Sequence, residues 1–327
     1  MLNPNLSGLS KSTSFYSTLS FLAFLLAFVV ILLGAYTRLT NAGLSCPDWP
    51  RCYGYLTPPL TTPQIEAATK AYPQIPLDKT RAWTEMRHRY LAGLEGLLIV
   101  TLITLSWYWR KELPPLVFKL SQPLILILLG QVILGKLTVT ALLKPVIVLG
   151  HLLLGFFLMS LLWIICLLTR KPLVFSARQH LSLWVSLGLG ILILQIALGG
   201  WVSTHSAGLA CIDFPYCKGS FLPALQWNAF DTDLITIQMM HRLGALFTLF
   251  YLSLLSLFLL LQKSSRRFGL LLLSLLVTQM LLGILNILWL RPLFIALSHH
   301  AVAALLLLTL LATLVHTPQQ GHKPCIK

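Results

Sequence analysis

The chain has 327 residues, of which 57% are apolar and 10% are charged. Charged residues make up roughly a quarter of a soluble domain, so this composition excludes an ordinary soluble globular protein. The apolar content also excludes a disordered chain. The net charge of +15 does not indicate a nucleic-acid partner, because lysine and arginine also collect in the cytoplasmic loops of membrane proteins. We therefore expect an all-α polytopic membrane protein.

Apolar segments of membrane-spanning length recur along the whole chain. They predict eight transmembrane helices, at about residues 15–37, 86–109, 118–142, 145–168, 181–203, 237–262, 268–290 and 292–315. Two long loops, 38–85 and 204–236, join the first helix to the second and the fifth to the sixth.

Basic side chains gather in the links after the second, fourth and sixth helices. These links carry Arg110, Lys111, Lys119, Arg170, Lys171, Arg178, Lys263, Arg266 and Arg267, and Glu112 is the only acidic residue in them. The positive-inside rule predicts that these links and both termini are cytoplasmic. The two long loops then lie on the outer side of the membrane.

A motif in the first long loop is repeated in the second. Residues 42–54 read AGLSCPDWPRCYG, and residues 207–219 read AGLACIDFPYCKG. At the same spacing of 165 residues, Gly34 matches Gly199. Such agreement indicates an internal duplication.

The duplication predicts two tandem units with four helices each. We place them at residues 1–174 and 175–327. Because each unit has an even number of spans, both have the same orientation, and a pseudo-twofold axis along the membrane normal should relate them. Each unit is expected to be a four-helix bundle, whose core is a natural site for a cofactor.

Four histidines occupy matching places on the even-numbered helices. They are His88, His151, His241 and His299, each within about two turns of the outer end of its helix. A lone histidine in a membrane span is usually a packed, hydrogen-bonded residue, but four at equivalent positions of a repeat indicate a function. Two imidazoles in each bundle core suit a heme iron bound from both faces. Zinc fits less well, because two histidines alone leave it short of ligands.

A second histidine follows His299 directly, so either His299 or His300 is the candidate iron ligand. The segment 131–135 recurs 148 residues later as 279–283, with glutamine and glycine at its ends. The same spacing relates His151 to His299 and favours His299 as the ligand.

Glu85 distinguishes the first unit from the second. It lies three residues before His88 on the same helix face, whereas the matching position before His241 is Gln238. A carboxylate exchanges protons and an amide does not, so we expect chemistry in the first unit and electron storage or a structural role in the second. The alternative is a solvated glutamate at the start of a helix.

Three basic residues near the outer boundary have open roles. Arg89 and Arg242 each follow a candidate ligand, and they either pair with heme propionates or extend to lipid headgroups. Lys136 lies within the third helix, where the repeat has Ile284, and snorkelling to the interface is its simplest interpretation.

Each long loop contains a pair of cysteines, Cys46 with Cys52 and Cys211 with Cys217. Paired thiols on the oxidising outer side of a bacterial membrane tend to form disulfides. These pairs either hold each loop over its bundle or pass electrons. The spacing differs from the C-x-x-C of thioredoxin-like sites, and the sequence has no C-x-x-C-H signal for covalent c-type heme.

These residues together resemble the heme A synthase family over nearly the whole chain. The motifs that carry the resemblance are TRLTNAGLSCPDWP at 37–50, Glu85-x-x-His88-Arg89, Thr138-Val139-Thr140 and Lys144-Pro145 before His151, Gly208-Leu209 with the second cysteine pair, His241-Arg242, and His299. His300 departs from the family pattern, in which a glutamine commonly follows this histidine.

The resemblance implies a multi-pass, heme-dependent oxidoreductase of the bacterial plasma membrane. Its reaction would oxidise the C8 methyl group of heme O to a formyl group, giving heme A for terminal oxidase assembly. His88 and His151 would hold the substrate heme O, Glu85 would be the essential acidic residue, and His241 and His299 would hold a heme b cofactor. Heme O synthase and terminal oxidase assembly factors are the implied protein partners, and membrane lipid surrounds the helices.

Two other functions also fit paired histidines. One is a non-enzymatic di-heme b protein that transfers electrons, and the other is a heme carrier. Both predicted sites lie at one outer level, which gives no relay across the membrane and favours the enzyme.

Overall fold

The computed structural model describes residues 11–170 and 179–316 of the chain. Two basic residues of the predicted links, Lys171 and Arg178, lie outside the described residues. The expected boundary between the two units, at residue 174, lies outside them as well.

The described ranges are mostly helical, with isolated bridges in place of a sheet. The helices are α1 (Lys11–Leu39), α2 (Thr62–Ala71), α3 (Lys79–Tyr108), α4 (Pro115–Ser121), α5 (Leu124–Thr140), α6 (Pro145–Arg170), α7 (Gln179–Thr204), η2 (Ala207–Leu209), η3 (Trp227–Ala229), α8 (Leu234–Leu261), α9 (Arg266–Leu288) and α10 (Leu293–His316). Within these ranges, eight helical segments are long and apolar enough to cross a membrane. Each corresponds to one predicted span, so the prediction of an eight-span all-α membrane protein is confirmed.

The third span is broken where the sequence predicted one continuous helix. α4 ends at Ser121 and α5 begins at Leu124, with Gln122 and Pro123 between them. Pro123 has no N–H to donate to the carbonyl four residues earlier, and its ring crowds that carbonyl. The proline therefore interrupts the helix without ending the span.

α3 begins well before the apolar stretch that predicted it. Asp78 is its N-cap, and the Asp78 carboxylate accepts a hydrogen bond of 3.1 Å from the N–H of Arg81. A capping aspartate satisfies one of the free N–H groups of the first turn. The early start places Glu85 inside the helix instead of at its beginning.

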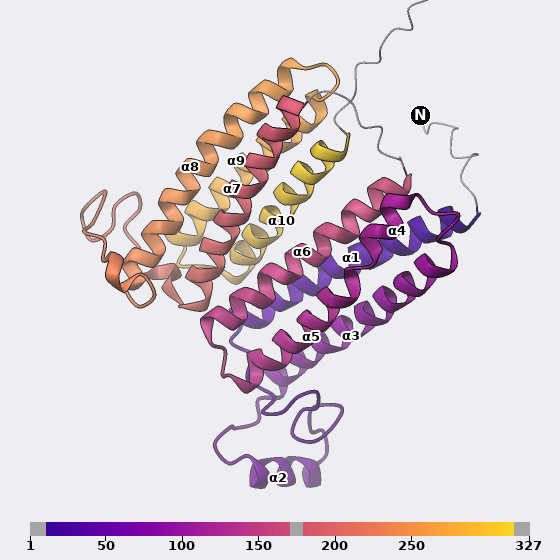
Figure 1. The fold of residues 1–327 in the computed structure, drawn as a ribbon. Helices are drawn as coiled ribbons and strands as arrows, with labels where there is room; N and C mark the ends of the chain where they lie inside the picture. Colours follow the sequence, from indigo (N-terminus) through magenta and orange to yellow (C-terminus); the bar gives the residue numbers. More distant parts are fainter. Residues whose placement is uncertain (1–10, 171–178, 317–327) are drawn as a thin grey trace, which may run out of the picture.

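The spans form two groups that lie side by side (Figure 1). In the N-terminal group, which consists of α1 and α3 to α6, α1 packs on α3 and α6, and α5 packs on α3 and α6. In the C-terminal group, which consists of α7 to α10, each helix packs on the next and α10 returns to α7. The helices of each group thus surround a central space.

The two groups meet along α1, α6, α7 and α10. Trp163 of α6 donates its indole N–H to the carbonyl of Leu308 on α10 at 3.1 Å. The ring of Phe24 on α1 lies 4.7 Å from the Trp163 ring, and Met159 and Leu162 of α6 are fully buried nearby in the same core. This apolar core joins the groups on the side away from the long loops.

The repeated motif folds in the same way in both long loops. The Asp48 carboxylate accepts a hydrogen bond of 2.9 Å from the N–H of Gly54, and the Asp213 carboxylate accepts one of 2.8 Å from the N–H of Gly219. Gly54 and Gly219 have φ angles of 83° and 77°, which only glycine adopts easily. The first loop also contains α2, which lies beyond the ends of α3 and α5 (Figure 1).

Candidate functional site

Each candidate histidine of the N-terminal group lies against a glycine on the preceding span. A Cβ atom added at Gly34 of α1 would lie 3.1 Å from Cε1 of His88 on α3. One added at Gly135 of α5 would lie 3.4 Å from Cε1 of His151 on α6. The two imidazoles therefore occupy space that a glycine leaves free on the neighbouring helix.

The C-terminal group repeats both contacts. A Cβ atom at Gly199 of α7 would lie 3.0 Å from Cε1 of His241 on α8, and one at Gly283 of α9 would lie 3.2 Å from Cε1 of His299 on α10. Gly34 corresponds to Gly199 in the sequence repeat, and Gly135 corresponds to Gly283. Each of these glycines contacts a candidate histidine of its own group.

One cavity of about 1140 Å³ is lined by residues of both groups, including all four histidines. Most other side chains in the lining are apolar. The volume exceeds the roughly 300–1,000 Å³ of ordinary small-molecule sites, so the cavity has room for large apolar ligands.

Glutamine side chains contact the histidines of the C-terminal group. Nε2 of Gln195 lies 3.0 Å from Nδ1 of His241 and also donates to the His241 carbonyl at 3.0 Å. Nε2 of Gln279 lies 3.3 Å from Nε2 of His299. These contacts restrain the orientation of the two imidazoles.

Both cysteine pairs form disulfides. The Cα atoms of Cys46 and Cys52 are 4.6 Å apart, and those of Cys211 and Cys217 are 4.8 Å apart. All four residues are buried. Because thiol exchange requires access to a sulfur atom, this burial favours a structural role over a redox role.

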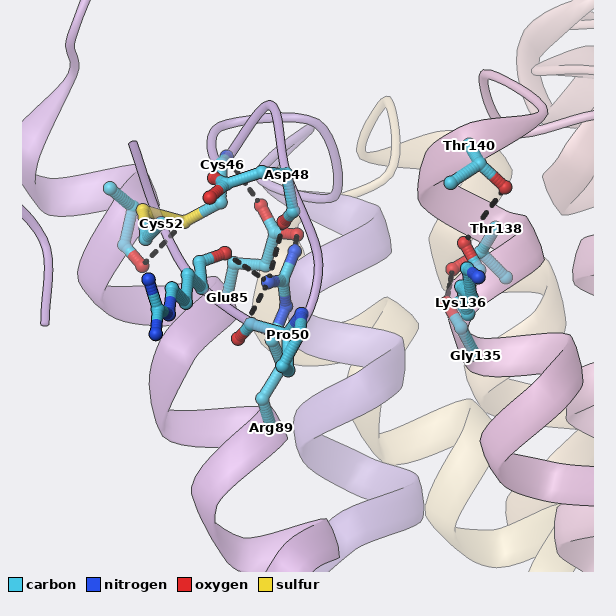
Figure 2. Close-up of polar contacts among 12 residues, drawn as sticks. Cys46, Asp48, Pro50, Cys52, Glu85, Arg89, Gly135, Lys136, Thr138 and Thr140 are labelled. Carbon is cyan, nitrogen blue, oxygen red and sulfur yellow. Dashed lines mark hydrogen bonds and ion pairs between the residues drawn. A yellow bond between two sulfur atoms is a disulfide. The ribbon is translucent and has the colours of Figure 1, made fainter. Parts of the chain in front are cut away.

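Glu85 is buried beneath the first disulfide loop, so it is not a solvated residue at a helix start. One carboxylate oxygen accepts a hydrogen bond of 2.9 Å from the N–H of Cys46, and the other forms an ion pair with Arg89. Arg89 also donates to the carbonyl of Asp48 at 2.9 Å (Figure 2) and to the carbonyl of Arg51 at 2.8 Å. Glu85 and Arg89 together attach the loop to α3, and both line the cavity.

Gln238 makes the corresponding contact in the C-terminal group. Its Oε1 accepts a hydrogen bond of 2.6 Å from the N–H of Cys211, and its Nε2 donates to the carbonyl of Gly208 at 3.0 Å. Arg242 donates to the carbonyls of Cys211 and Tyr216. Arg89 and Arg242 thus hold their own loops, a role that the sequence did not predict.

Two other arginines line the cavity where the groups meet. Arg38 of α1 donates to the carbonyl of Ser203 on α7 at 2.7 Å and to the hydroxyl of Ser206 at 3.3 Å. The side chain of Arg291 comes within 3.6 Å of a Cβ atom placed at Gly208. Neither forms an ion pair within the described part of the chain. Two neighbouring cations without a carboxylate favour an anionic group of a ligand.

A second buried carboxyl group also lines the cavity, and the sequence reasoning missed it. Glu95 of α3 is only 5% exposed. Its Oε1 is buried and has no hydrogen-bond partner within residues 11–170 and 179–316. The sequence could have indicated this residue, because Glu95 lies inside a predicted span. It follows His88 by seven residues and therefore lies on the same helix face.

The neighbouring histidines of α10 lie against different elements. His299 lies against Gly283 of α9, as described above. The ring of His300 packs edge-on against Phe156 of α6, with 5.4 Å between the ring centroids. Only His299 therefore takes the position that His151 has in the N-terminal group.

Lys136 does not face the cavity. It is exposed, and Gly135 beside it lines the cavity instead. The hydroxyl of Thr140, in the last turn of α5, donates to the Lys136 carbonyl at 3.3 Å (Figure 2). A lysine this close to the end of a span extends easily to the interface.

The side chains of the cavity suit a heme better than a bare metal ion. In the two described ranges, no three histidine, cysteine, aspartate or glutamate side chains cluster as a metal site. Nδ1 atoms of His88, His151 and His299 are buried and find no partner in the same ranges. Paired imidazoles between apolar walls fit a planar iron porphyrin held from both faces.

The fold and the cavity define a multi-pass membrane protein with a pair of histidines in each of two helix groups. The chain belongs to the cytochrome oxidase assembly protein family, whose model matches residues 17–311. It is 39% identical over 302 residues to a protein of Shewanella oneidensis named heme A synthase, an alignment that covers 86% of this chain and 90% of the relative. Proteins with the same name from Beijerinckia indica and Rhodopseudomonas palustris are 30% and 31% identical, over 86% and 85% of this chain and 87% and 82% of their own lengths.

Proposed function

We propose that this protein is a heme A synthase, an oxidoreductase that converts the C8 methyl group of heme O to a formyl group. The observation that carries the proposal is the cavity with a histidine pair in each helix group and a carboxylate beside only one pair. The names of the relatives support the same reaction. A carrier or an electron relay is not favoured, because neither requires this asymmetry.

We assign the substrate to the N-terminal unit, residues 1–174. His88 and His151 would hold the iron of heme O between α3 and α6. The matching glycines, Gly34 and Gly135, support this role because they set the two imidazoles at the cavity wall. The apolar lining would receive the farnesyl chain of the substrate.

We assign a heme b cofactor to the C-terminal unit, residues 175–327. His241 and His299 would be its iron ligands, and Gln195, whose Nε2 lies 3.0 Å from Nδ1 of His241, would help to hold that ring in place. A heme bound by two imidazoles supplies reversible electron transfer. At the position that matches Glu85, this unit has the uncharged Gln238 in place of a carboxylate.

Glu85 would act as the catalytic acid–base group. Its carboxylate lies in the cavity lining one helical turn before His88, where it could take up a proton that the methyl group loses on oxidation. The electrons lost with that proton would pass to an external electron acceptor, which the oxidation requires. Arg89 keeps the carboxylate in place through the ion pair. The propionates of a bound heme would find cationic partners in Arg38 and Arg291, since Arg89 and Arg242 already hold their own loops.

We propose that both termini are cytoplasmic and that the disulfide loops face the outside of a bacterial plasma membrane. The basic links after the second, fourth and sixth spans support this orientation, and so do the disulfides, which form in oxidising compartments. Heme O synthase and the assembly factors of terminal oxidases are the corresponding protein partners.

Heme analysis tests the reaction directly. The chain is expressed in a host that lacks its own heme A synthase, together with a heme O synthase, and the hemes of the membranes are extracted and separated. We expect heme A to accumulate only when this chain is present. Accumulation of heme O with no heme A, in membranes that contain the folded protein, would reject the proposal.

A further inference from the structure

Glu95 is a buried carboxyl group that the proposed reaction does not use. It lies on α3 seven residues beyond His88, two turns or roughly 10 Å farther from the disulfide loop on the same face. It is 5% exposed, it lines the cavity, and it forms no ion pair within the described residues. Its Oε1 is buried without a hydrogen-bond partner in those residues.

The cavity lining near Glu95 is mostly apolar. Between His88 and the far end of the cavity, the N-terminal group contributes Ala92, Leu97, Val100 and Leu128 to the lining, and the polar Gln131, whose amide donates to the His151 carbonyl at 3.0 Å. A buried carboxyl group without a partner is destabilising in such a setting, above all inside a membrane. The arrangement therefore indicates that a bound molecule supplies the missing hydrogen-bond partner.

The C-terminal group has a hydroxyl group in place of this carboxyl group. Thr248 stands at the position that matches Glu95 in the repeat, seven residues beyond His241. Its hydroxyl donates to the carbonyl of Gly244 at 2.8 Å, so it is satisfied within its own helix. Among the described residues, an unpartnered carboxyl group therefore lines the cavity only in the unit that we assign to the substrate. The buried atoms without a partner in the other unit belong to amide, imidazole and guanidinium groups, such as Oε1 of Gln195 and Gln279.

The chemistry of heme O leaves one group that can pair with Glu95. The two propionates are carboxylates, which a second carboxyl group would not attract and which Arg38 and Arg291 suit better. The pyrrole nitrogens bind the iron, and the farnesyl chain is a hydrocarbon. The remaining polar group is the hydroxyl on the carbon that joins the farnesyl chain to the ring, and heme b carries a vinyl group at that position.

We infer that Glu95 hydrogen-bonds to this hydroxyl group and thereby selects heme O over heme b in the N-terminal unit. The inference rests on the proposed function. It makes Glu95 a specificity-determining residue that contacts the side chain of the substrate and takes no part in oxidising the methyl group.

The test measures affinity and does not depend on turnover. The purified protein, with its resident heme, is titrated in detergent with heme O and separately with heme b, and binding is followed by the absorbance change. We expect Glu95→Leu to weaken heme O binding roughly tenfold and to leave heme b binding unchanged. Glu95→Gln should retain most of the preference, because an amide also pairs with a hydroxyl. Thr248→Val is the matched control and should leave both affinities unchanged.

A second measurement alters the ligand and leaves the protein intact. A heme O analogue dehydrated at the carbon that carries the hydroxyl should bind the wild-type protein about as weakly as heme O binds Glu95→Leu. The inference is overturned if Glu95→Leu weakens heme O and heme b equally, or if the dehydrated analogue binds as tightly as heme O. Heme A formation by the same wild-type preparation is scored separately, so failure of the proposed function is recognised independently.

Discussion

Gly199 of α7 and His241 of α8 are in direct contact, since a Cβ atom at Gly199 would lie 3.0 Å from Cε1 of the imidazole. Because Gly199 has no side chain, the backbone of α7 packs directly against the imidazole of His241. The contact is repeated at each of the other three candidate ligands, so the positions of the imidazoles depend on glycines that carry no chemistry themselves.

The substitution Gly199→Ala should therefore disturb the second heme site. The added methyl group forces the imidazole of His241 away from α7, at a cost of about 1–3 kcal/mol for an overfilled site. We expect less heme b per protein and a broadened low-spin absorbance in the purified variant. Gly190→Ala is the matched control on the same helix, because a Cβ atom there meets nothing within 4 Å. Equal heme content in the two variants would contradict the role of this contact.

Glu85 has two proposed roles, which are to attach the first disulfide loop to α3 and to exchange protons during the reaction. Glu85→Gln should separate them. Gln238 shows that an amide accepts the cysteine N–H in the same way, so the loop and its disulfide should persist. The variant loses the group that exchanges protons, and heme A formation should fall by about 100-fold or more. Extracted hemes measure the reaction, and thiol labelling after denaturation checks the disulfide. Gln238→Glu should still form heme A. Normal heme A formation by Glu85→Gln would remove Glu85 from the mechanism.

His299→Ala and His300→Gln should have opposite outcomes. His299 lies against Gly283 as the other candidate ligands lie against their glycines, whereas His300 packs on Phe156. We expect His299→Ala to lose the low-spin heme spectrum of the C-terminal unit and His300→Gln to retain it. The absorbance of the reduced, purified proteins decides the matter. A reversed result would identify His300 as the iron ligand.

Asp213 should stabilise the second disulfide loop near neutral pH, and this contribution should disappear only in acid. Hydrogen bonds from the N–H groups of Gly219 and Lys218 lower the pKa of Asp213 below its ordinary value. A group with a lowered pKa in the folded state stabilises that state above its unfolded pKa, and this contribution disappears as the pH falls through the folded pKa. Asp213→Ala should therefore lower Tm by a constant amount between about pH 5 and 8, and the difference from wild type should shrink below the aspartate range. Asp231→Ala, an exposed change in the same loop, should show no such pattern, and a difference that persists in acid would contradict the assignment.

The sequence by itself determined the number and the approximate places of the spans, because burial in lipid requires long apolar stretches and these are local properties of the chain. It also determined which histidines correspond, since a duplication preserves their spacing. The buried position of Glu85 was open from the sequence, because the helix start at Asp78 precedes the apolar stretch.

Only the tertiary structure decided which polar groups find partners. Arg89 and Arg242 donate to loop carbonyls that lie far from them in the sequence, and their basic character alone does not reveal such contacts. The sequence also does not reveal which of the two glutamates on α3 has partners. Glu85 has a cysteine N–H and an arginine within reach, whereas Oε1 of Glu95 has no partner among the described residues. Hydrogen bonding depends on distances between separate helices, and those distances are fixed by packing.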